Sequence, residues 1–594
     1  MQESVIYCNV QYKIWGDDPV KGMMKYLKGY GKESVIAPLF KMLEALFDLL
    51  VPLVMADIID KGISGGDAAY IWQRCALLVA LGLIGLACSL TAQYFASRAA
   101  VGYAGRLRHA LMEHIQSLGF AELDELGGST LITRMTSDIN QVQSGLNLFL
   151  RLFMRSPFVV IGGMVMAFIV DARAAMIFVI TIPVLAVVVF GIMLWTMPMY
   201  KRVQSSLDGV TGLTRENLSG ARVIRAFNME RAEVSRFEAA DKLLSGMQLR
   251  VGRISALMNP LTYAIVNIAV IAILNVGAAQ IDAGLMLSGS VIALVSYMSQ
   301  ILVELVKLAN LIIQVTKALA CAGRVKAVLD KQPAMRFAEQ PARPDYAADA
   351  VRFDNVSLRY PGAGDDSISG ISFAARPGQT IGIIGGTGSG KTSLINLIPR
   401  FYDATSGSVQ LFGRPIAEFT RSQLRGMVSV VMQRAQLFQG TIRSNLLFGA
   451  PGADENQLWQ ALECAQAADF VRARPNGLDD AVEQGGRNLS GGQRQRLTIA
   501  RALVKQPRIL ILDDSASALD YATDAALRRA LNDLPGDMTT FIVSQRTSSM
   551  MHADCILVLD DGELVGAGTH EQLMKSCQVY REIYESQFGK EGER

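Results

Sequence analysis

The sequence predicts a multi-domain membrane protein, in which a six-helix, all-α transmembrane domain with long cytosolic helix extensions is followed by an α/β domain. Three observations support this fold class. The chain has 594 residues, which favours more than one domain. Its apolar residues gather in long runs before about residue 315. From Val351 onward, short β-like runs alternate with helical patterns, which is typical of a mainly parallel sheet.

Six apolar runs are long enough to cross a bilayer, which takes about 20 mainly apolar residues in a helix. Their number, length and clustering favour membrane spans over buried helices of a soluble protein. The runs, with approximate edges, are 35–58, 74–96, 146–169, 174–196, 256–281 and 286–310.

Arginines gather in two long intervals between the runs, 97–145 and 197–255, whereas the other connections are short and hold few cations. Because positive residues stay on the cytoplasmic side, we expect both intervals and both termini in the cytoplasm. The expected location is the bacterial plasma membrane, crossed several times. Both intervals have a helical pattern, so spans two to five are expected to continue as helices into the cytosol.

Two patches in these intervals have the pattern of a helix tip. One runs from Gly127 to Arg134 and is followed by Asp138, and the other runs from Ser219 to Phe227. Glycines mark the turns, and apolar side chains beside arginine would give each tip a surface that docks. The alternative is a solvated turn with no partner.

A phosphate-binding loop opens the second domain. Gly385 to Thr392 reads G-x-x-x-x-G-K-T after a β-branched strand pattern. Its N–H groups must point at phosphates, and side chains at positions 385, 388 and 390 would block that approach, which explains Gly385, Gly388 and Gly390. Lys391 is expected to reach the β/γ-phosphates, and Thr392 to offer its hydroxyl to Mg²⁺. These features predict an α/β P-loop nucleotide-binding domain that uses ATP and Mg²⁺.

The predicted organisation has four segments. Residues 1–34 form a cytosolic amphipathic segment suited to a membrane surface, and residues 35–320 form the transmembrane domain. Residues 321–350 form a linker, in which Lys331 to Asp349 is rich in Pro and Ala, and residues 351–589 form the nucleotide-binding domain.

Further polar residues lie where strand or helix patterns end. Tyr360 is a candidate stacking face for adenine, and Gln433 follows a strand-like run, from which its amide could reach Mg²⁺ or water. Asp513 ends a buried strand, as expected of a carboxylate that coordinates Mg²⁺. Leu489-Ser490-Gly491-Gly492-Gln493 opens a helix and makes a second anion site.

With these motifs the chain resembles an exporter-type ATP-binding-cassette (ABC) transporter, with one membrane domain fused to one cassette. The resemblance covers nearly the whole chain. It implies that residues 385–393 are Walker A, Gln433 the Q-loop, residues 489–493 the signature, Asp513 the Walker B acid and residues 517–520 the D-loop. The implied contacts of ATP are Tyr360, Gly385, Gly386, Thr387, Gly388, Ser389, Gly390, Lys391, Thr392 and Ser393, with Thr392, Gln433 and Asp513 around Mg²⁺ and Asp520 in the D-loop.

In that family two cassettes close head to tail, and each ATP lies between the Walker motifs of one and the signature of the other. Two residues of this chain depart from the family pattern. Asp514 stands where the family has a catalytic Glu, and Gln545 stands where it has His. A glutamine can hydrogen-bond a phosphate but, unlike a histidine, it cannot carry a proton or a positive charge. We therefore expect this ATP site to bind well and hydrolyse poorly, as one half of a heterodimer whose partner carries the Glu and the His.

Ionisable residues also occur inside the predicted spans, where they are costly and usually face a cavity or one another. Glu44 and Asp48 share a helix face, Arg151 and Arg155 repeat that spacing, and Lys41, Glu304 and Lys307 lie in the first and last spans. One interpretation makes them structural ion pairs. The other makes Glu44, Asp48, Arg151 and Arg155 the lining of a translocation chamber whose acids favour cationic substrates.

These observations predict a subunit of an ATP-driven exporter of amphipathic small molecules, lipids or peptides. Two alternatives stay open: a regulatory subunit that binds ATP without transport, and an importer on the exporter fold. The net charge of +3 gives no reason to expect a nucleic acid partner. The expected partners are a related half-transporter, the lipid bilayer and the transported substrate.

Overall fold

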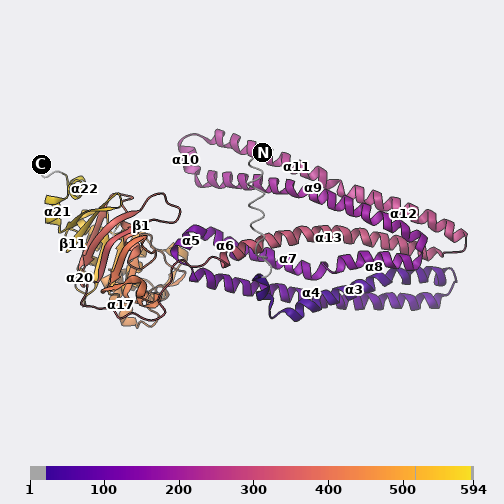
Figure 1. Cartoon of the computed structure of the whole chain (residues 1–594), viewed down its shortest axis with the longest axis horizontal. Helices are drawn as coiled ribbons and strands as arrows, with labels where there is room; N and C mark the ends of the chain where they lie inside the picture. Colours follow the sequence, from indigo (N-terminus) through magenta and orange to yellow (C-terminus); the bar gives the residue numbers. More distant parts are fainter. Residues whose placement is uncertain (1–21, 516, 535, 590–594) are drawn as a thin grey trace. The chain divides into compact units, whose positions relative to one another are not determined.

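The computed structural model describes residues 22–515, 517–534 and 536–589, and it divides into two compact units (Figure 1). The helical unit comprises Met1–Gln116 and Ser129–Lys331, and the sheet unit comprises Ser117–Gly128 and Gln332–Arg594. Most of the predicted N-terminal amphipathic segment, residues 1–21, lies outside the described residues.

The helical unit contains long helices and a few short turns. In chain order its elements are η1 (Met24–Leu27), α3 (Gly31–Asp57), η2 (Ile58–Ile63), α4 (Ala68–Ser117), α6 (Gly128–Thr133), η3 (Arg134–Asp138), α7 (Ile139–Leu152), α8 (Arg155–Val170), α9 (Ala172–Ser219), α10 (Ala221–Ala226), α11 (Glu230–Ala256), α12 (Met258–Asp282) and α13 (Ser288–Leu329).

All six predicted spans fall on these helices. Among the described residues, five helical stretches are long and apolar enough to cross a membrane: Ala68–Ser117, Gly128–Val170, Ala172–Ser219, Glu230–Asp282 and Ser288–Leu329. The first predicted span lies in α3, which has 27 residues but carries Lys41, Glu44 and Asp48. The helices of spans two to five extend well beyond the apolar runs, as the sequence predicts.

Helix α13 lies at the centre of the helical unit, where it packs on α3, α7, α8, α9 and α12. The buried core includes Phe178, Tyr297 and Ile301, all fully shielded from solvent. Tyr297 donates its hydroxyl hydrogen to the carbonyl oxygen of Leu49 on α3 at 2.7 Å. A buried tyrosine needs such a partner, so this bond fixes the pairing of the first and last spans.

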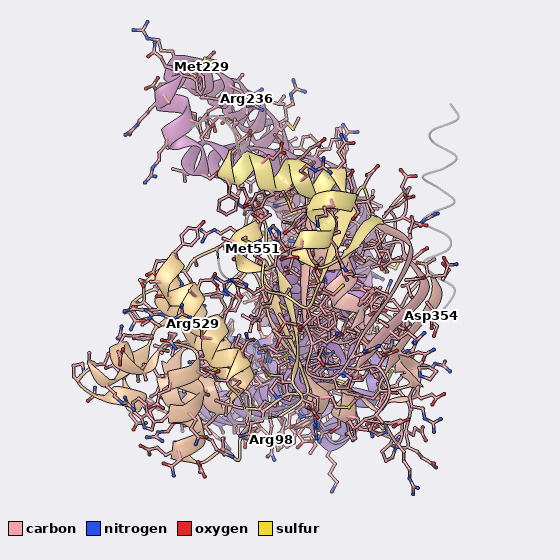
Figure 2. The ribbon with its side chains drawn as sticks, turned by 90° about the vertical axis from the view of Figure 1, so that its left-hand side faces the viewer. Arg98, Met229, Arg236, Asp354, Arg529 and Met551 are labelled. Atoms are coloured by element: carbon pink, nitrogen blue, oxygen red, sulfur yellow. The ribbon has the colours of Figure 1, made fainter. Side chains whose placement is uncertain are left out.

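Helices α9 and α11 run side by side and are joined at their tip by α10, as Figure 1 shows. The tip exposes Val223 and Phe227, the latter by 75%. Met229 and Arg236 lie on the same end of the pair (Figure 2). The second predicted tip, Ser219 to Phe227, is therefore a short helix with an exposed apolar surface.

The first predicted tip lies one turn earlier than expected. The short helix α5 (Phe120–Leu126) ends at Gly127, which has a φ of 72°, and belongs to the sheet unit. Residues Arg134 and Asp138 belong instead to the helical unit, where Asp138 bonds Arg134 and Arg324 at 2.8 and 2.5 Å. The Gly127–Arg134 pattern marked the end of the tip rather than its docking helix.

The linker is shorter than predicted. Helix α13 continues to Leu329, so the first nine residues of the predicted linker, 321–329, are helical. Cys321 and Val325 are buried there, and this burial keeps the last turns of the helix in place. The segment without regular structure runs from Asp330 to Ala350.

The sheet unit mixes strands and helices. In chain order its elements are α5 (Phe120–Leu126), β1 (Val351–Leu358), β2 (Ile368–Ala375), β3 (Thr380–Gly385), α14 (Lys391–Leu397), β4 (Ser406–Leu411), β5 (Arg414–Pro415), η4 (Ile416–Glu418), α15 (Arg421–Met427), β6 (Val428–Val431), β7 (Gly440–Thr441), α16 (Ile442–Leu447), α17 (Glu455–Cys464), α18 (Ala468–Arg472), η5 (Gly477–Asp479), β8 (Ala481–Val482), η6 (Gln484–Gly486), α19 (Gly491–Leu503), β9 (Ile509–Asp513), α20 (Tyr521–Asn532), β10 (Thr539–Val543), η7 (Thr547–Ser549), β11 (Cys555–Asp560), β12 (Glu563–Gly568), α21 (His570–Ser576) and α22 (Gln578–Phe588).

The larger sheet has the strand order β12-β11-β3-β10-β9-β6. Its strands are parallel except for the edge strand β12. Strands β9 and β10 are buried along their whole length, as expected of parallel strands covered on both faces. The parallel sheet is confirmed, and it brings the carboxyl ends of β3, β9, β10 and β6 to one edge.

A second, antiparallel sheet has the order β2-β1-β4-β5, and the sequence did not predict it. Strand β1 lies between β2 and β4, with Phe353 opposite Phe373 and Val409. The two sheets share a core that includes Phe353, Phe412 and Phe541. The fold class, a helical transmembrane domain joined to an α/β domain, is thus confirmed.

Candidate nucleotide site

The phosphate loop connects the end of β3 to the start of α14, as the motif predicts. A Cβ atom at Gly385 would lie 2.5 Å from the Ser389 hydroxyl oxygen, so only glycine fits. Gly390 has a φ of 89°, and a Cβ there would lie 2.6 Å from Ile368. The loop can therefore keep its curl only with glycine at these two positions.

Lys391 points back into the loop. Its ammonium donates to the carbonyl oxygens of Gly385 and Gly386 at 3.0 and 2.6 Å, and it lies 3.3 Å from the Ser389 hydroxyl. Burial lowers the pKa of Lys391, while the nearby Asp513 and Asp514 raise it. A cation held at the mouth of a glycine loop is suited to phosphate oxygens.

Thr392 and Asp513 meet at the edge of the sheet. The Thr392 hydroxyl lies 3.4 and 3.3 Å from the two carboxylate oxygens of Asp513, which ends β9. Burial raises the pKa of Asp513, and the bond from Thr392 opposes that shift. Hydroxyl and carboxylate oxygens are the ligands that Mg²⁺ prefers, so these two residues fit the expected ion.

Gln433 and Asp514 are brought together from neighbouring strands. Gln433 follows β6, Asp514 follows β9, and these strands pair in parallel. The Gln433 amide donates to the Asp514 carboxylate at 3.2 Å. Asp514 has a φ of 46°, a left-handed conformation that is uncommon outside glycine. Its backbone N–H donates to the carbonyl oxygen of Val543 on β10, and this bond holds the turn.

Gln545 follows β10 at the same edge, and its residue is exposed. The edge thus gathers the phosphate loop, Gln433, Asp513, Asp514 and Gln545 from four parallel strands. This agrees with the rule that ligands of such sheets bind at the carboxyl ends.

Tyr360 lies beside the loop. Its hydroxyl donates to the Ser393 hydroxyl oxygen at 3.1 Å, which ties the ring to the first turn of α14. The ring also meets Tyr402 at 89°, with the ring centres 5.0 Å apart. Sequence reasoning missed Tyr402, because no local pattern indicates that it reaches Tyr360.

A cavity of about 270 Å³ borders the loop. It is lined by Gly388, Lys391 and Thr392, and also by residues that sequence reasoning did not single out. These are Asp366, Ser367, Asp561 and Gly562. They come from the turns before β2 and β12, whose closeness to the loop depends on the long-range pairing of the sheets.

The signature residues lie at the start of α19, away from any bond to the phosphate loop within the described part of the chain. Ser490 caps the helix by accepting from the Gln493 backbone at 3.2 Å, and the Gln493 side chain accepts in return at 3.0 Å. Leu489 is buried, while Gly491 is exposed with open space around the position of a Cβ. Gly492 is closer packed, since a Cβ there would lie 3.2 Å from the carbonyl oxygen of Ala518.

Asp520 begins α20 and accepts from the Thr523 backbone at 2.7 Å. This bond lowers the pKa of Asp520. The predicted D-loop residue is therefore a helix cap that stays ionised.

Helix α5 docks next to Tyr360 and Tyr402. Phe120 stacks on Phe401 with ring centres 4.2 Å apart. The Arg425 guanidinium also lies over the Phe401 ring, 4.7 Å from its centre. The Tyr402 hydroxyl donates to the Asp124 carboxylate. Burial, followed by the bond to Asp124, raises the pKa of Tyr402. Tyr402 thus contacts both α5 and the ring of Tyr360, the candidate stacking face for adenine.

Charged residues of the first, third and sixth predicted spans form an ion-pair network. Arg155 bonds Asp48 at 2.9 Å, bonds Glu304, and lies 4.0 Å from Glu44. Lys41 bonds Glu44 at 2.5 Å, and Lys307 bonds Glu304 at 2.8 Å. These contacts favour the structural-pair interpretation over the substrate chamber for Glu44, Asp48 and Arg155. Arg151 stands apart, and its buried Nε has no hydrogen-bond partner among the described residues.

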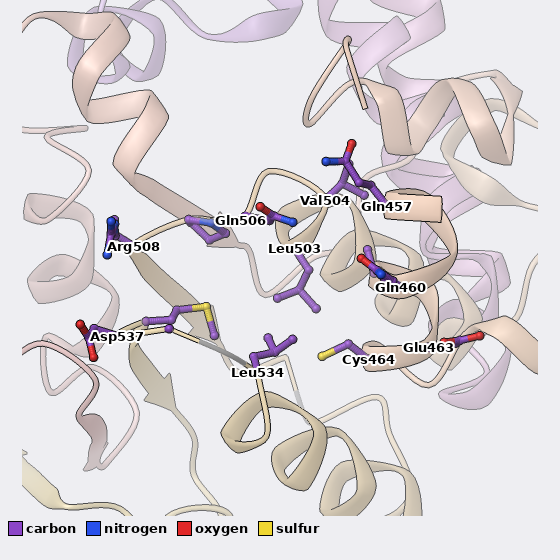
Figure 3. Close-up of a pocket in the computed structure, with 14 residues that line it drawn as sticks. Gln457, Gln460, Glu463, Cys464, Leu503, Val504, Gln506, Arg508, Leu534 and Asp537 are labelled. Atoms are coloured by element: carbon purple, nitrogen blue, oxygen red, sulfur yellow. The ribbon is translucent and has the colours of Figure 1, made fainter. Parts of the chain in front are cut away.

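A larger cavity, of about 660 Å³, lies at the other end of the parallel sheet (Figure 3). Its lining includes Arg508 and Met538, which immediately precede β9 and β10, together with Gln460 and Leu534. It is therefore at the amino ends of the strands and does not form part of the nucleotide site.

Two family models match the chain. The ABC transporter transmembrane region matches residues 34–305, and the ABC transporter model matches residues 368–517. An uncharacterised ABC transporter ATP-binding protein of Mycobacterium tuberculosis is 36% identical over 95% of this chain and 97% of its own length. A similarly described protein of Bacillus subtilis is 34% identical, over 96% and 99%.

An ATP-dependent lipid A-core flippase of Bordetella avium is 31% identical over 96% of this chain and 98% of its own length. Among solved structures, a bacterial Atm1-family ABC exporter with ATP bound has the same fold, with a TM-score of 0.78 at 22% identity over 95% of this chain and 99% of its own. From these relationships and from the motifs above, the chain belongs to the ABC transporters, with an ABC transporter transmembrane region and an ABC transporter nucleotide-binding domain in one polypeptide.

Proposed function

We propose that this chain is one half of a heterodimeric ATP-driven exporter. Its own ATP site binds nucleotide and hydrolyses it poorly, and its signature completes a competent site on a related partner. The single observation that carries the proposal is the contrast between Asp514 and Gln545, which replace the family's Glu and His, and a fully formed signature cap at Ser490.

The chemistry of Asp514 supports a weak site. Its side chain is one methylene shorter than that of Glu, and its carboxylate already accepts from Gln433 at 3.2 Å. A general base must lie within hydrogen-bond reach of the water that it activates. Gln545 supplies an amide in place of an imidazole, so it can orient a phosphate but cannot hold a proton for it.

The binding half of the site is complete. Gly385 to Ser393 would surround the phosphates, Lys391 would neutralise the terminal ones, and Tyr360 would stack on adenine. Thr392, Asp513 and Gln433 would hold Mg²⁺, which neutralises charge on the phosphates. ATP binding would then favour the closed pair of cassettes and shift the membrane helices between two openings.

The proposed cargo is amphipathic: a lipid, a small molecule or a peptide. A lipid A-core flippase among the relatives supports the lipid class. The proposed location is the plasma membrane, with both termini in the cytoplasm. In a variant without its seven natural cysteines, a cysteine at Ser64 should react with an impermeant thiol reagent outside intact cells, and one at Arg225 only after permeabilisation. The opposite pattern would reverse the orientation.

The test is transport by the purified pair in vesicles. The gene product that co-purifies with this chain should carry Glu and His at the two altered positions. Cassettes that face the outside of the vesicles should drive a fluorescent lipid inward when ATP is added, which is export in cell orientation. ATP-dependent movement the other way would favour the importer, and ATP binding with no movement of lipid, dye or peptide probes would favour the regulatory subunit.

A further inference from the structure

We infer that the C-terminal helix α22 positions the switch loop of the nucleotide site through Gln587. The switch loop, residues 545–549, follows β10 and carries Gln545 at its start. Gln587 lies 42 residues after Gln545, and no motif singles it out.

The carboxamide of Gln587 makes three hydrogen bonds to the loop. Its nitrogen donates to the carbonyl oxygen of Gln545 at 2.7 Å. Its oxygen accepts from the backbone N–H and the hydroxyl of Thr547, each at 2.9 Å. Within the described chain, no other side chain bonds the backbone of Gln545 or Thr547. One amide therefore fixes both sides of the turn that presents Gln545.

Helix α22 is itself anchored to the strand that leads into the phosphate loop. Tyr580 is fully buried, and its hydroxyl lies 2.8 Å from His570 Nδ1. It packs in one cluster with Ile384, the residue before Gly385. Positions seven apart in a helix lie on the same face, so the anchored face also carries Gln587. Helix α22 therefore contacts both the switch loop, through Gln587, and the strand that leads into the phosphate loop, through Tyr580.

The rest of the switch loop is held from α20. Arg528 donates to the carbonyl oxygen of Ser548 at 2.9 Å, and the Ser549 hydroxyl donates to Asp524 at 3.3 Å. These bonds fix the far end of the loop and leave its beginning to Gln587. Loss of the Gln587 amide should therefore free Gln545 while the loop stays attached.

The inference rests on the proposed role of Gln545 at the terminal phosphate. Gln587 would be a positioning residue, because its carboxamide bonds the backbone of Gln545 and Thr547 and would act only through the side chain that this turn presents. Tyr360 and Lys391 would still bind ATP without it. The expected signature is a lower single-turnover rate of hydrolysis at this site with unchanged affinity for Mg-ATP. A net hydrogen-bond contribution of about 0.5–1.5 kcal/mol per bond corresponds to a roughly two- to thirteenfold lower rate.

The experiment uses the full-length chain in its purified complex, with the partner's catalytic Glu neutralised if the partner is present. Four variants are compared: Gln587→Ala, Gln587→Glu, Gln545→His, and Gln545→His with Gln587→Ala. Gln587→Glu keeps the acceptor for Thr547 but loses the donor to Gln545, so its rate should fall between those of wild type and Gln587→Ala. Gln578→Ala is the matched control, because Gln578 lies on the same helix and its side chain bonds Glu582 and no other described residue.

Gln545→His should raise the single-turnover rate, and adding Gln587→Ala should remove most of that gain, so the two effects are not additive. Equal rates in Gln587→Ala and wild type, or strict additivity, would overturn the inference. So would a parallel fall of nucleotide affinity and thermal stability, which would indicate only a structural helix. If this chain instead forms an active homodimer, the proposed function fails, but the same four rates still decide the role of Gln587.

Discussion

The residues that would bind nucleotide are separable from those that would hydrolyse it. Tyr360 bonds the first turn of α14 and Lys391 bonds the loop carbonyls, while Asp514 and Gln545 follow the neighbouring strands β9 and β10. A change in the first pair should therefore act on affinity, and a change in the second on rate. This division is what a site that retains binding after losing catalysis requires.

Tyr360→Ala should weaken ATP binding at this site. Stacking of a base on an aromatic ring contributes about 1–3 kcal/mol, so we expect a loss of roughly 5- to 150-fold in affinity. Tyr360→Phe is the control, since it keeps the ring and loses only the bond to Ser393. Equilibrium binding of a fluorescent ATP analogue measures both. Lys391→Ala should also weaken binding; unchanged affinity in Tyr360→Ala and Lys391→Ala would show that the nucleotide lies elsewhere.

Sequence alone predicted that the phosphate loop, Asp513 and Gln433 each lie at or just after the end of a strand, because short-range chemistry fixes that position. A glycine loop between strand and helix admits one geometry, and an acid after a buried strand emerges at its carboxyl end. It did not reveal Tyr402 or Gln587, or the left-handed turn at Asp514. Those depend on contacts between segments far apart in the chain, such as the 42 residues that separate Gln545 from Gln587.

At the scale of elements, α5 connects a helical tip to the nucleotide site. Asp124, Tyr402 and Tyr360 form a continuous series of contacts from α5 to the ring that would carry adenine. The sequence placed this tip one turn late, because glycines mark the end of a turn and not the helix before it. Phe120 stacks on Phe401, but the residues around Phe120 form no sequence pattern that would predict this contact.

Tyr402→Phe should loosen this connection without harming the site. The ring that supports Tyr360 remains, and only the bond to Asp124 is lost. We expect unchanged affinity for ATP but a smaller stimulation of ATPase activity by transport substrate. Asp124→Asn in addition should have little further effect, because it changes the same bond. Tyr346→Phe, on a tyrosine packed against Phe412 instead of α5, is the control. Equal stimulation in Tyr402→Phe and wild type would contradict the role of the hydroxyl.

The ion-pair network joins three helices, α3, α8 and α13, through Arg155. Glu304 has a side chain only 4% exposed, so removing its guanidinium partner leaves a poorly solvated carboxylate with Lys307 as its remaining cation. Breaking such a buried pair typically destabilises by about 3–5 kcal/mol, whereas replacing both charges is far milder. The network is therefore expected to keep these helices together as one body.

Arg155→Met should lower the thermal unfolding midpoint in detergent, and Arg155→Met with Glu304→Gln should recover much of the loss. Lys242→Ala is the control, because its pair with Glu238 is exposed on both sides and contributes less than about 1 kcal/mol. A double variant as unstable as Arg155→Met would mean that packing of the arginine stem, rather than charge pairing, holds these helices.

At the scale of the whole molecule, the single chain carries two half-sites. The phosphate loop and the signature cap share one cassette, yet they share no hydrogen bond within the described residues. In the proposed dimer, each would act opposite a second cassette. The sequence could predict both halves from their motifs, but it could not predict which chain supplies that second cassette.

The two halves should respond oppositely to mutation. Asp514→Asn should reduce ATP turnover of the purified complex only modestly, because the short carboxylate is already a poor base. Gly491→Trp should nearly abolish turnover, because the signature closes on the partner's ATP, where hydrolysis is proposed to occur. Loss of one positioned transition-state contact costs on the order of 10²–10³ in rate.

A side chain at Gly491 meets open space in this chain, so the Gly491→Trp variant should fold, and unchanged nucleotide binding at the Lys391 site would verify it. Gly491→Ala should lie between Trp and wild type, since the loss depends on side-chain bulk between the cassettes. A homodimer of this chain with brisk turnover that Asp514→Asn eliminates would make Asp514 a working base and exclude the heterodimer.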